Sequence, residues 1–405
     1  MPIASRSVLA LALSGIILFA LGIRTGVAAI APLAGQIELD VALIGVPLGA
    51  LGTIPPIAYA VAASVSPWLV KRVGIEWVAI AMALVGALAH LWRGFSPTYL
   101  SLFVATVVVM LAAGVANVIL PGLVKLYAPQ AIGPMTAAYA TAMAISSSSP
   151  TVVGLWVSEQ WGWRISLASW AVVSVLGVIP WLFVLPFARQ RGVAEAQALV
   201  DSGPPRPPLR LWSSSTALSI LLIFSVAGVS AYTWFGLLPV ILVDISGLSV
   251  ASAALALGLF AIIGLPLSLT IPPLAVRPGW SPYLVAASAV CGVAGVAGLL
   301  LAPGWMPFLW VAFLGCAPLT FHLSLTLIGQ RTRDHRGALE VSGFVNTMGY
   351  LFAAAAPVLV GLVFEITGGW TMALISIGVV MLLQIPAIGI LAREAIVEDE
   401  LSTRA

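Results

Sequence analysis

The sequence predicts an all-α membrane protein whose twelve transmembrane helices form two pseudo-symmetric six-helix halves. Three observations predict this fold class: the composition, the length of the apolar runs and an internal repeat. Of the 405 residues, 61% are hydrophobic and 8% are charged, whereas a soluble domain carries roughly 25% charged residues. Because no soluble core could hide this much apolar side chain, lipid must surround most of the chain.

Twelve apolar runs are long enough to cross a bilayer, which takes about 20 residues. They lack alternation and are too long for barrel strands, so we expect helices. The first run resembles a signal peptide, but it continues through Pro32 without a short cleavage region, and we expect it to be retained. The runs lie at 8–35, 42–66, 76–93, 98–124, 133–157, 165–187, 214–242, 248–271, 282–302, 305–328, 338–364 and 370–392.

A polar, proline-rich and basic segment follows the sixth run, ARQRGVAEAQALVDSGPPRPPLRLWS. A stretch of about 25 residues is too short for a domain of its own. We therefore expect an N-terminal half at 1–188, a cytoplasmic linker at 189–213 and a C-terminal half at 214–405.

The basic residues predict the orientation of the chain. If the N-terminus is cytoplasmic, 14 of the 17 basic residues fall on cytoplasmic segments. The opposite side holds Arg93 and Arg164, and Arg24 lies within the membrane. This positive-inside bias explains the basic pI without a nucleic-acid partner. We expect a multi-pass protein of the inner (cytoplasmic) membrane with both termini cytoplasmic.

The two halves resemble each other in sequence. PTVVGLWVSEQWGW (150–163) and PVLVGLVFEITGGW (357–370) share Pro, Val, Gly, Leu, Gly and Trp at an offset of 207, which Pro32 and Pro239 also share. Two short loops match at a nearly equal offset of 205, PWLVKRVG and PPLAVRPG. Parallel six-helix halves joined by a cytoplasmic linker resemble the major facilitator superfamily.

Shorter motifs resemble the cyanate and 2-nitroimidazole transporter branch of that superfamily. Arg24 precedes Pro32-Leu33 in the first run, the fourth run ends in NVILPGLVK (117–125), and the seventh contains Leu237-Leu238-Pro239. A GYLFAAAAP stretch ends at Pro357. The resemblance implies alternating access by a monomer around a small-molecule substrate.

One superfamily pattern is degenerate in this chain. The helix 2–3 loop of the superfamily reads G-x3-D-x3-G-R-[RK], but here Val70 stands at the Asp position and Ile75 at the Arg position. Only Gly74 remains, which puts the usual gating contact of this loop in doubt.

Arg24 is a permanent cation inside an apolar run, where a charge is costly unless it faces a partner or water. Every acidic residue lies in a loop, a tail or a helix end. The sequence therefore favours a small anionic substrate as the partner, since guanidinium binds cyanate, carboxylate or nitro groups by paired hydrogen bonds. The alternative is a structural arginine bonded to backbone carbonyls or hydroxyls.

The repeat points to further substrate-binding candidates. At offset 207, Tyr139 matches Asn346 and Met143 matches Tyr350, and each pair is spaced i, i+4 on one helix face. We expect Tyr139, Asn346 and Tyr350 to line the substrate cavity, with polar helix packing as the alternative. Asn117 is either cavity lining or an interhelical hydrogen-bonding group.

Other candidates carry two interpretations each. Trp234 is a candidate for lining the binding site of a flat ligand with its aromatic ring. It cannot share one helix face with both Tyr232 and Phe235. His322 is either a proton-linked or substrate-contacting group or a packing residue. Lys125 either attracts and gates the anion or snorkels to the interface. The SSSSP run (146–150) predicts helix packing with hydroxyls bonded to their own helix.

Metal and cofactor sites are not expected. His90, His322 and His335 are scattered, while Cys291 and Cys316 lie in apolar runs without a CxxC motif. The runs offer no cluster of acid, base and nucleophile, so we expect no enzyme.

The leading functional prediction is a secondary active or facilitative transporter of a small organic or pseudohalide anion, cyanate- or carboxylate-like, working by alternating access. Its expected partners are this anion and the bilayer, with protons through His322 as an open option. The alternative is an exporter of neutral flat aromatics such as nitroimidazoles. No Walker motif is present, so ATP is not the direct energy source.

Overall fold

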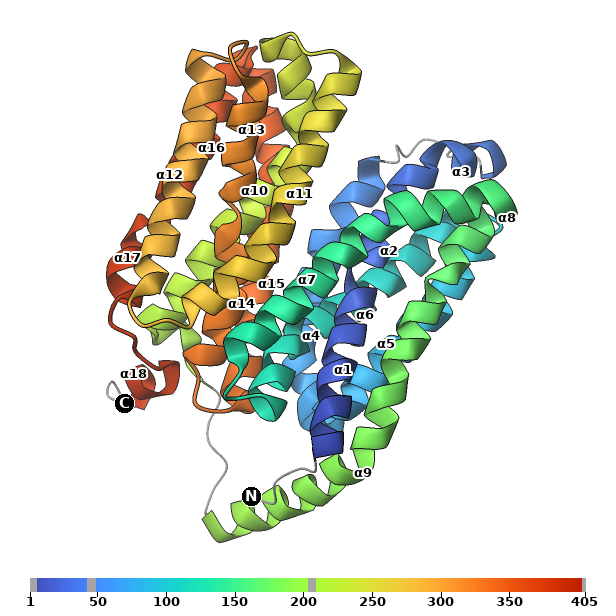
Figure 1. The fold of residues 1–405 in the computed structure, drawn as a ribbon, viewed down its shortest axis with the longest axis vertical. Coiled ribbons are helices and arrows are strands. Elements are labelled where there is room, and N and C mark those ends of the chain that lie inside the picture. Colours follow the sequence, from blue (N-terminus) through green and yellow to red (C-terminus); the bar gives the residue numbers. More distant parts are fainter. Residues whose placement is uncertain (1–5, 42–48, 203–208, 403–405) are drawn as a thin grey trace. The chain divides into compact units, whose positions relative to one another are not determined.

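The computed structural model describes residues 6–41, 49–202 and 209–402, which contain helices and no β-strand (Figure 1). The predicted all-α fold is confirmed. Within the described residues, ten helical stretches are long and apolar enough to cross a membrane. One of them, Ile132–Ala188, covers two predicted runs. The predicted run 42–66 begins outside the described residues and continues in α4.

The chain contacts divide into two compact units. Unit 1 comprises 1–130, 142–210 and 334–343, and unit 2 comprises 131–141, 211–333 and 344–405. Two short segments therefore pack outside the halves to which the sequence assigns them. The predicted linker is partly helical, because the helix before it continues to Ser202. The boundaries of the predicted halves stay a prediction.

Unit 1 is a bundle in which α1, α5, α6 and α9 lie side by side (Figure 1). The start of α15 belongs to it: Ser342 Oγ donates to the Val118 carbonyl at 2.8 Å. Its helices are α1 (Arg6–Ile23), α2 (Thr25–Ala28), η1 (Ala31–Leu33), α3 (Ala34–Asp40), α4 (Gly49–Val73), α5 (Ile75–Gly94), α6 (Tyr99–Tyr127), the second part of α7 (Ile132–Ser149), η2 (Pro150–Gly154), α8 (Leu155–Ser169) and α9 (Ala171–Ser202).

Unit 2 is a second bundle, with an apolar core that contains Trp234, Phe260, Leu314 and Trp370. The start of α7 belongs to it. Its other helices are η3 (Leu211–Ser213), α10 (Ser215–Ser246), α11 (Val250–Ala275), α12 (Trp280–Leu301), α13 (Pro307–Cys316), α14 (Leu319–Gln330), most of α15 (His335–Thr367), α16 (Trp370–Leu382), α17 (Ile385–Leu391) and α18 (Val397–Ser402).

The internal repeat reappears as the same hydrogen bond in both units. Trp163 Nε1 donates to Asp40 Oδ2 at 2.9 Å in unit 1. Trp370 Nε1 donates to Asp244 Oδ2 at 2.8 Å in unit 2. The two tryptophans are the pair that the sequence repeat aligns. The repeat therefore extends from sequence to hydrogen bonding.

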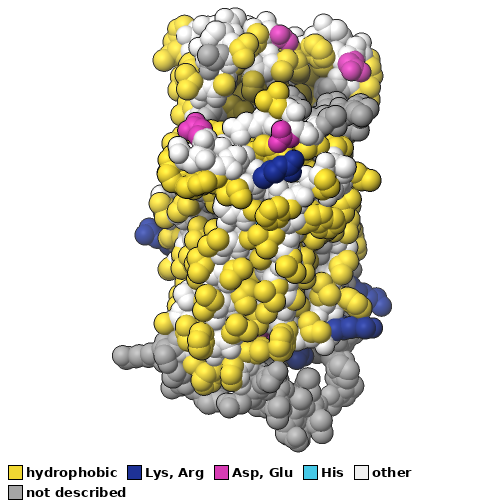
Figure 2. All heavy atoms as spheres, turned by 90° about the vertical axis from the view of Figure 1, so that its right-hand side faces the viewer, with side chains coloured by type: hydrophobic (Ala, Val, Ile, Leu, Met, Phe, Trp, Pro, Cys, Tyr) yellow, Lys and Arg dark blue, Asp and Glu magenta, His cyan; other side chains and the backbone are white. Residues whose placement is uncertain are grey.

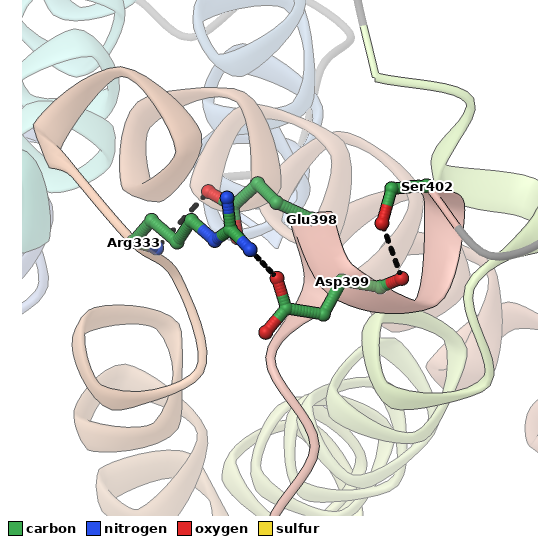
Figure 3. A network of polar contacts seen from close by, with 4 residues as sticks. All are labelled: Arg333, Glu398, Asp399 and Ser402. Atoms are coloured by element: carbon green, nitrogen blue, oxygen red, sulfur yellow. Dashed lines mark hydrogen bonds and ion pairs between the residues drawn. The ribbon is translucent and has the colours of Figure 1, made fainter.

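The segment 394–400 binds other parts of unit 2 through its carboxylates. Glu398 accepts a hydrogen bond from the Arg333 amide at 3.1 Å, and Asp399 pairs with the Arg333 guanidinium (Figure 3). Glu394 accepts one from the Gly279 amide at 2.9 Å. We call these residues the carboxylate clasp: Glu394, Glu398, Asp399 and Glu400.

Glu400 caps the first turn of α10. Its carboxylate accepts hydrogen bonds from the hydroxyls of Ser214 at 2.6 Å, Ser215 at 2.9 Å and Thr216 at 2.7 Å, and from the Thr216 amide at 3.1 Å. Burial alone would raise the pKa of Glu400, but these hydrogen bonds outweigh it and hold the pKa below its ordinary value. A negative charge here also complements the helix dipole.

Hydrophobic side chains cover most of the face in Figure 2, and few charged side chains interrupt them. Exposed large apolar residues of unit 1 include Leu88 and Phe183. Such a surface would be a liability in water and suits acyl chains. The chain is a multi-pass membrane protein.

Candidate functional site

The first helix of unit 1 is interrupted at Arg24. α1 ends at Ile23, α2 begins at Thr25, and Arg24 lies between them with φ −97° and ψ −15°. Lipid cannot bond the backbone groups that such a break frees, so protein groups must do so. The Tyr59 hydroxyl donates to the Ile23 carbonyl at 3.1 Å. The amides of Arg24 and Thr25 donate to Ser146 Oγ at 2.9 and 3.0 Å. Side chains of α4 and α7 therefore hold the break.

Tyr59 also supports the guanidinium. Arg24 Cζ lies 5.4 Å from the centroid of the Tyr59 ring, which is within cation–π range. Tyr59 is fully buried, and its ring packs so closely on Gly114 that a Cβ there would lie 3.1 Å from Tyr59 Cδ1. Tyr59 thus fixes both the backbone before Arg24 and the charged end of its half-buried side chain.

The sequence does not distinguish Ser146 from its neighbours in the SSSSP run, which it predicts to be helix-packing residues. Ser147 Oγ does donate to the Met143 carbonyl at 3.1 Å, and Ser148 Oγ to the Ala144 carbonyl at 3.2 Å. Ser146 differs, because its oxygen accepts from the broken helix. Sequence reasoning missed both Ser146 and Tyr59 as partners of Arg24.

The other two candidates of unit 1 lie on α6. Asn117 is buried and sits one turn after Gly114, on the face that packs against Tyr59. Lys125 is half-buried near the end of α6. Close by, the Tyr127 hydroxyl donates to Glu76 Oε1 at 2.7 Å and ties α6 to α5. The binding role of Asn117 and the gating role of Lys125 stay predictions.

Unit 2 contains a continuous row of aromatic rings. Phe224 lies 5.5 Å from Phe321 and 5.3 Å from Tyr350, between ring centroids. Tyr232 meets Tyr350 edge-on at 6.4 Å, and His322 meets Phe321 edge-on at 5.5 Å. The structure therefore brings two predicted site residues, Tyr350 and His322, into one row.

Three other candidates of unit 2 are buried. Tyr139 on α7 and Asn346 on α15 are 1% and 0% exposed. Trp234 is also fully buried, in the apolar core of unit 2 beside Leu238. This packing favours a structural role for Trp234, whereas Phe224 and Tyr232 of the same helix α10 belong to the aromatic row. The binding roles of Tyr139 and Asn346 stay predictions.

A second arginine reaches the broken helix. The sequence places Arg93 on the outer face of the membrane, but it lies in the last turn of α5 with its side chain fully buried. Its Nη1 donates to the Gly26 carbonyl at 3.0 Å. Gly26 also allows α2 to pack closely on α6, since a Cβ at this position would lie 2.3 Å from Val109 Cγ1.

The residues that the structure describes include no group of three or more His, Cys, Asp or Glu side chains that could hold a metal ion. Cys291 and Cys316 are free thiols. Arg24 itself offers charge, hydrogen bonds and ring stacking for recognition.

Comparison with known proteins assigns the family. The family model described as Major Facilitator Superfamily matches residues 11–357. The chain belongs to this superfamily. A solved superfamily structure, the proton:xylose symporter XylE bound to 6-bromo-6-deoxy-D-glucose, matches with a TM-score of 0.70 at 13% identity over 98% of both chains. This likeness shows the superfamily fold.

Two curated superfamily relatives cover nearly the whole chain. "Uncharacterized transporter YycB" of Bacillus subtilis (strain 168) is 27% identical over 370 residues, 90% of this chain and 89% of the relative. The "2-nitroimidazole transporter" of Escherichia coli (strain K12) is 27% identical over 373 residues, 92% of each. The chain is accordingly a membrane transporter of this superfamily and not an enzyme.

Proposed function

We propose that this transporter carries a small planar solute that presents a delocalised anionic group to Arg24. The leading substrate class is a small organic or pseudohalide anion, cyanate- or carboxylate-like. The observation that carries this proposal is the built setting of Arg24. A helix break positions it, Ser146 and Tyr59 bind the freed backbone groups, and the Tyr59 ring supports the guanidinium. Discontinuous membrane helices of this kind form substrate sites in other transporters.

A second substrate class is a neutral flat aromatic with a nitro group. Two observations favour it: the relative named a 2-nitroimidazole transporter, and the aromatic row of unit 2, whose rings suit a flat ligand. A nitro group and a carboxylate present a similar pair of oxygens to guanidinium. Whether transport requires a net negative charge separates the two classes.

Counterflow in proteoliposomes tests the proposal. The panel contains cyanate, acetate, benzoate and 2-nitroimidazole, with wild type beside Arg24→Gln and Arg24→Lys. We expect Arg24→Gln to lower the apparent affinity for the transported member about tenfold to a hundredfold, the scale of one or two charge-assisted hydrogen bonds. Lysine should restore part of this loss, since it keeps the charge without the planar fork.

Arg72→Gln is the matched control. Arg72 also stacks on an aromatic ring of α4, with its Cζ 4.5 Å from the centroid of Trp68, but it lies at the end of that helix. We expect this variant to transport like wild type. Transport by Arg24→Gln at wild-type affinity would refute the proposed role of Arg24.

We also propose a test of proton coupling through His322. Counterflow is measured from about pH 5.5 to about pH 8, on either side of the ordinary histidine pKa, for wild type and His322→Gln. A pH profile that the substitution flattens supports coupling. Equal pH profiles in the two proteins would exclude proton coupling through His322. The proposed anion recognition by Arg24 is tested independently, by the Arg24 variants.

A further inference from the structure

Arg93 is a fully buried cation with a single hydrogen bond. It lies inside unit 1 at the end of α5 and is 0% exposed. Its Nη1 donates to the Gly26 carbonyl at 3.0 Å. Its Nε and Nη2 are also buried, and they reach no acceptor among the residues that the structure describes. Buried N–H groups of a charged side chain are rarely left without a partner, because the loss of hydration is costly.

No carboxylate in the described ranges lies within 4.0 Å of Arg93. Asp40, which lies beside Arg164, is bound by other groups. Trp163 Nε1 donates to it at 2.9 Å, and Arg164 lies 3.8 Å from it. Arg164 adjoins the end of α5, where its Nη1 donates to the Ser96 carbonyl at 2.8 Å. One arginine of this region is thus paired, and Arg93 is not.

His90 extends the polar group along the same helix face. It lies one turn before Arg93, is 1% exposed, and its Nδ1 has no hydrogen-bond partner in the described part of the chain. The ring also hydrogen-bonds the Leu167 backbone carbonyl, so the free donors of this group are the two of Arg93. Two free donors and a positive charge suit an acceptor that is itself negative.

A small cavity adjoins this group. It measures about 30 Å³, and its lining includes Gly22, His90, Val109 and Ser174. Val109 is also the residue that Gly26 touches, so the cavity borders the place where Arg93 meets α2. A water molecule needs about 10–15 Å³ of such space, so the cavity has room for one small ion or two waters.

We propose that Arg93, with His90 one turn away, binds a small monovalent inorganic anion of the chloride class inside unit 1. Water could accept the free hydrogen bonds, but only an anion also compensates the charge in a low-dielectric interior. This site is separate from Arg24 and needs no transported substrate. Arg93 binds the Gly26 carbonyl, two residues after Arg24. An anion bound to Arg93 would therefore also stabilise the interrupted helix.

Halide-dependent stability tests the proposal on the purified full chain in nanodiscs. Tryptophan fluorescence reports the unfolding midpoint in sodium chloride, bromide or gluconate at equal ionic strength. We expect a saturable rise of about 3 °C or more in chloride and bromide over gluconate, the size that ligand linkage gives well above the dissociation constant. Equal midpoints in the three salts would overturn the proposal and leave water as the occupant.

Variants locate the effect. Arg93→Met should abolish the halide response, and Arg164→Gln, which changes the paired neighbour, should retain it. If Arg93→Met does not fold, Arg93→Lys serves, with an expected loss of at least about tenfold in halide affinity. A bromide anomalous peak beside Arg93 Nε and Nη2 in crystals of the wild type would support the site. A halide response that survives these substitutions would place the anion elsewhere and refute the assignment.

Discussion

The first helices of the two units are repeats of each other, yet one is broken and the other is not. In unit 1 the chain interrupts itself at Arg24, whereas α10 of unit 2 runs unbroken from Ser215 to Ser246. At the repeat offset of 207, the counterpart of Arg24 is Ala231. The break is therefore an addition to a symmetric framework.

The groups that hold the break are likewise confined to unit 1. The counterpart of Ser146 is Ala353, and that of Tyr59, at the offset of 205 that the following loop shows, is Gly264. Ala353 packs on α10 so tightly that a Cβ at Gly228 would lie 3.2 Å from it. One unit thus uses small apolar contact where the other uses hydrogen bonds. The Trp–Asp pairs are present in both units and belong to the symmetric part of the fold. The interruption at Arg24 is a place where unit 1 departs from this symmetry.

Ser146→Ala tests this comparison with the largest expected change in the free energy of unfolding. It leaves the amides of Arg24 and Thr25 without their acceptor, and two unsatisfied buried groups should cost about 2–6 kcal/mol. Denaturation in mixed micelles measures the loss. The control is Ala353→Ser, which adds a hydroxyl beside a helix with no free amides and should change stability by less than about 1 kcal/mol. Equal effects of the two substitutions would contradict the comparison.

The shared Trp–Asp pairs test the symmetric part. Trp163→Phe and Trp370→Phe each remove one hydrogen bond to a carboxylate, and each should cost about 1.5–3 kcal/mol. The same denaturation assay should give similar losses for both variants. A loss confined to one unit would mean that the two pairs do not play equivalent roles.

Tyr59→Phe separates the two contacts that Tyr59 makes at the helix break. It removes the hydrogen bond to the Ile23 carbonyl but keeps the ring under Arg24, so we expect a loss of about 1–2 kcal/mol with Arg24 still stacked. Tyr59→Leu removes both contacts and should lower substrate affinity further in counterflow. Tyr232→Phe is the control in the unbroken helix. Identical affinities for the Phe and Leu variants would exclude the stacking contribution.

The smallest expected effect concerns the carboxylate clasp of unit 2. The folded-state pKa of Glu400 lies below its ordinary value. Its stabilisation is therefore present above the unfolded-state pKa and lost as the pH falls through the folded-state pKa. Glu400→Gln should cost about 1 kcal/mol at neutral pH and nothing in acid.

Unfolding midpoints of wild type and Glu400→Gln between about pH 7 and about pH 3 measure this difference. The two curves should converge at the acidic end. Parallel curves would show that the ionised carboxylate does not carry the effect.

The sequence predicted the fold well because lipid restricts the possible backbone to few forms. Long apolar runs gave the helices, and the offset of 207 gave Trp163 and Trp370 as equivalents. It also singled out Arg24, since a cation in an apolar run is conspicuous. The partners of Arg24 were not visible, because Tyr59 and Ser146 lie 35 and 122 positions away and look like ordinary residues of their own helices.

The orientation of other side chains could not be predicted, for related physical reasons. Arg93 stands beside a loop in sequence, and only its burial and its hydrogen bond to the Gly26 carbonyl show that it points inward. Trp234 and Tyr232 are two positions apart, so the sequence could not tell which of them faces the core of unit 2 and which faces the aromatic row. Rotational placement of a helix with apolar residues on all sides comes from tertiary packing.

The clasp also sets an order for biogenesis. Glu400 lies 186 positions beyond the Ser214 hydroxyl that it binds. At about 5–20 residues per second, a ribosome needs roughly 10–40 s to travel between them. During that time the first turn of α10 can use the cap of its own Ser214 but lacks the hydrogen bonds to Glu400. The second bundle can lock its entry helix only when almost all of its sequence has been translated.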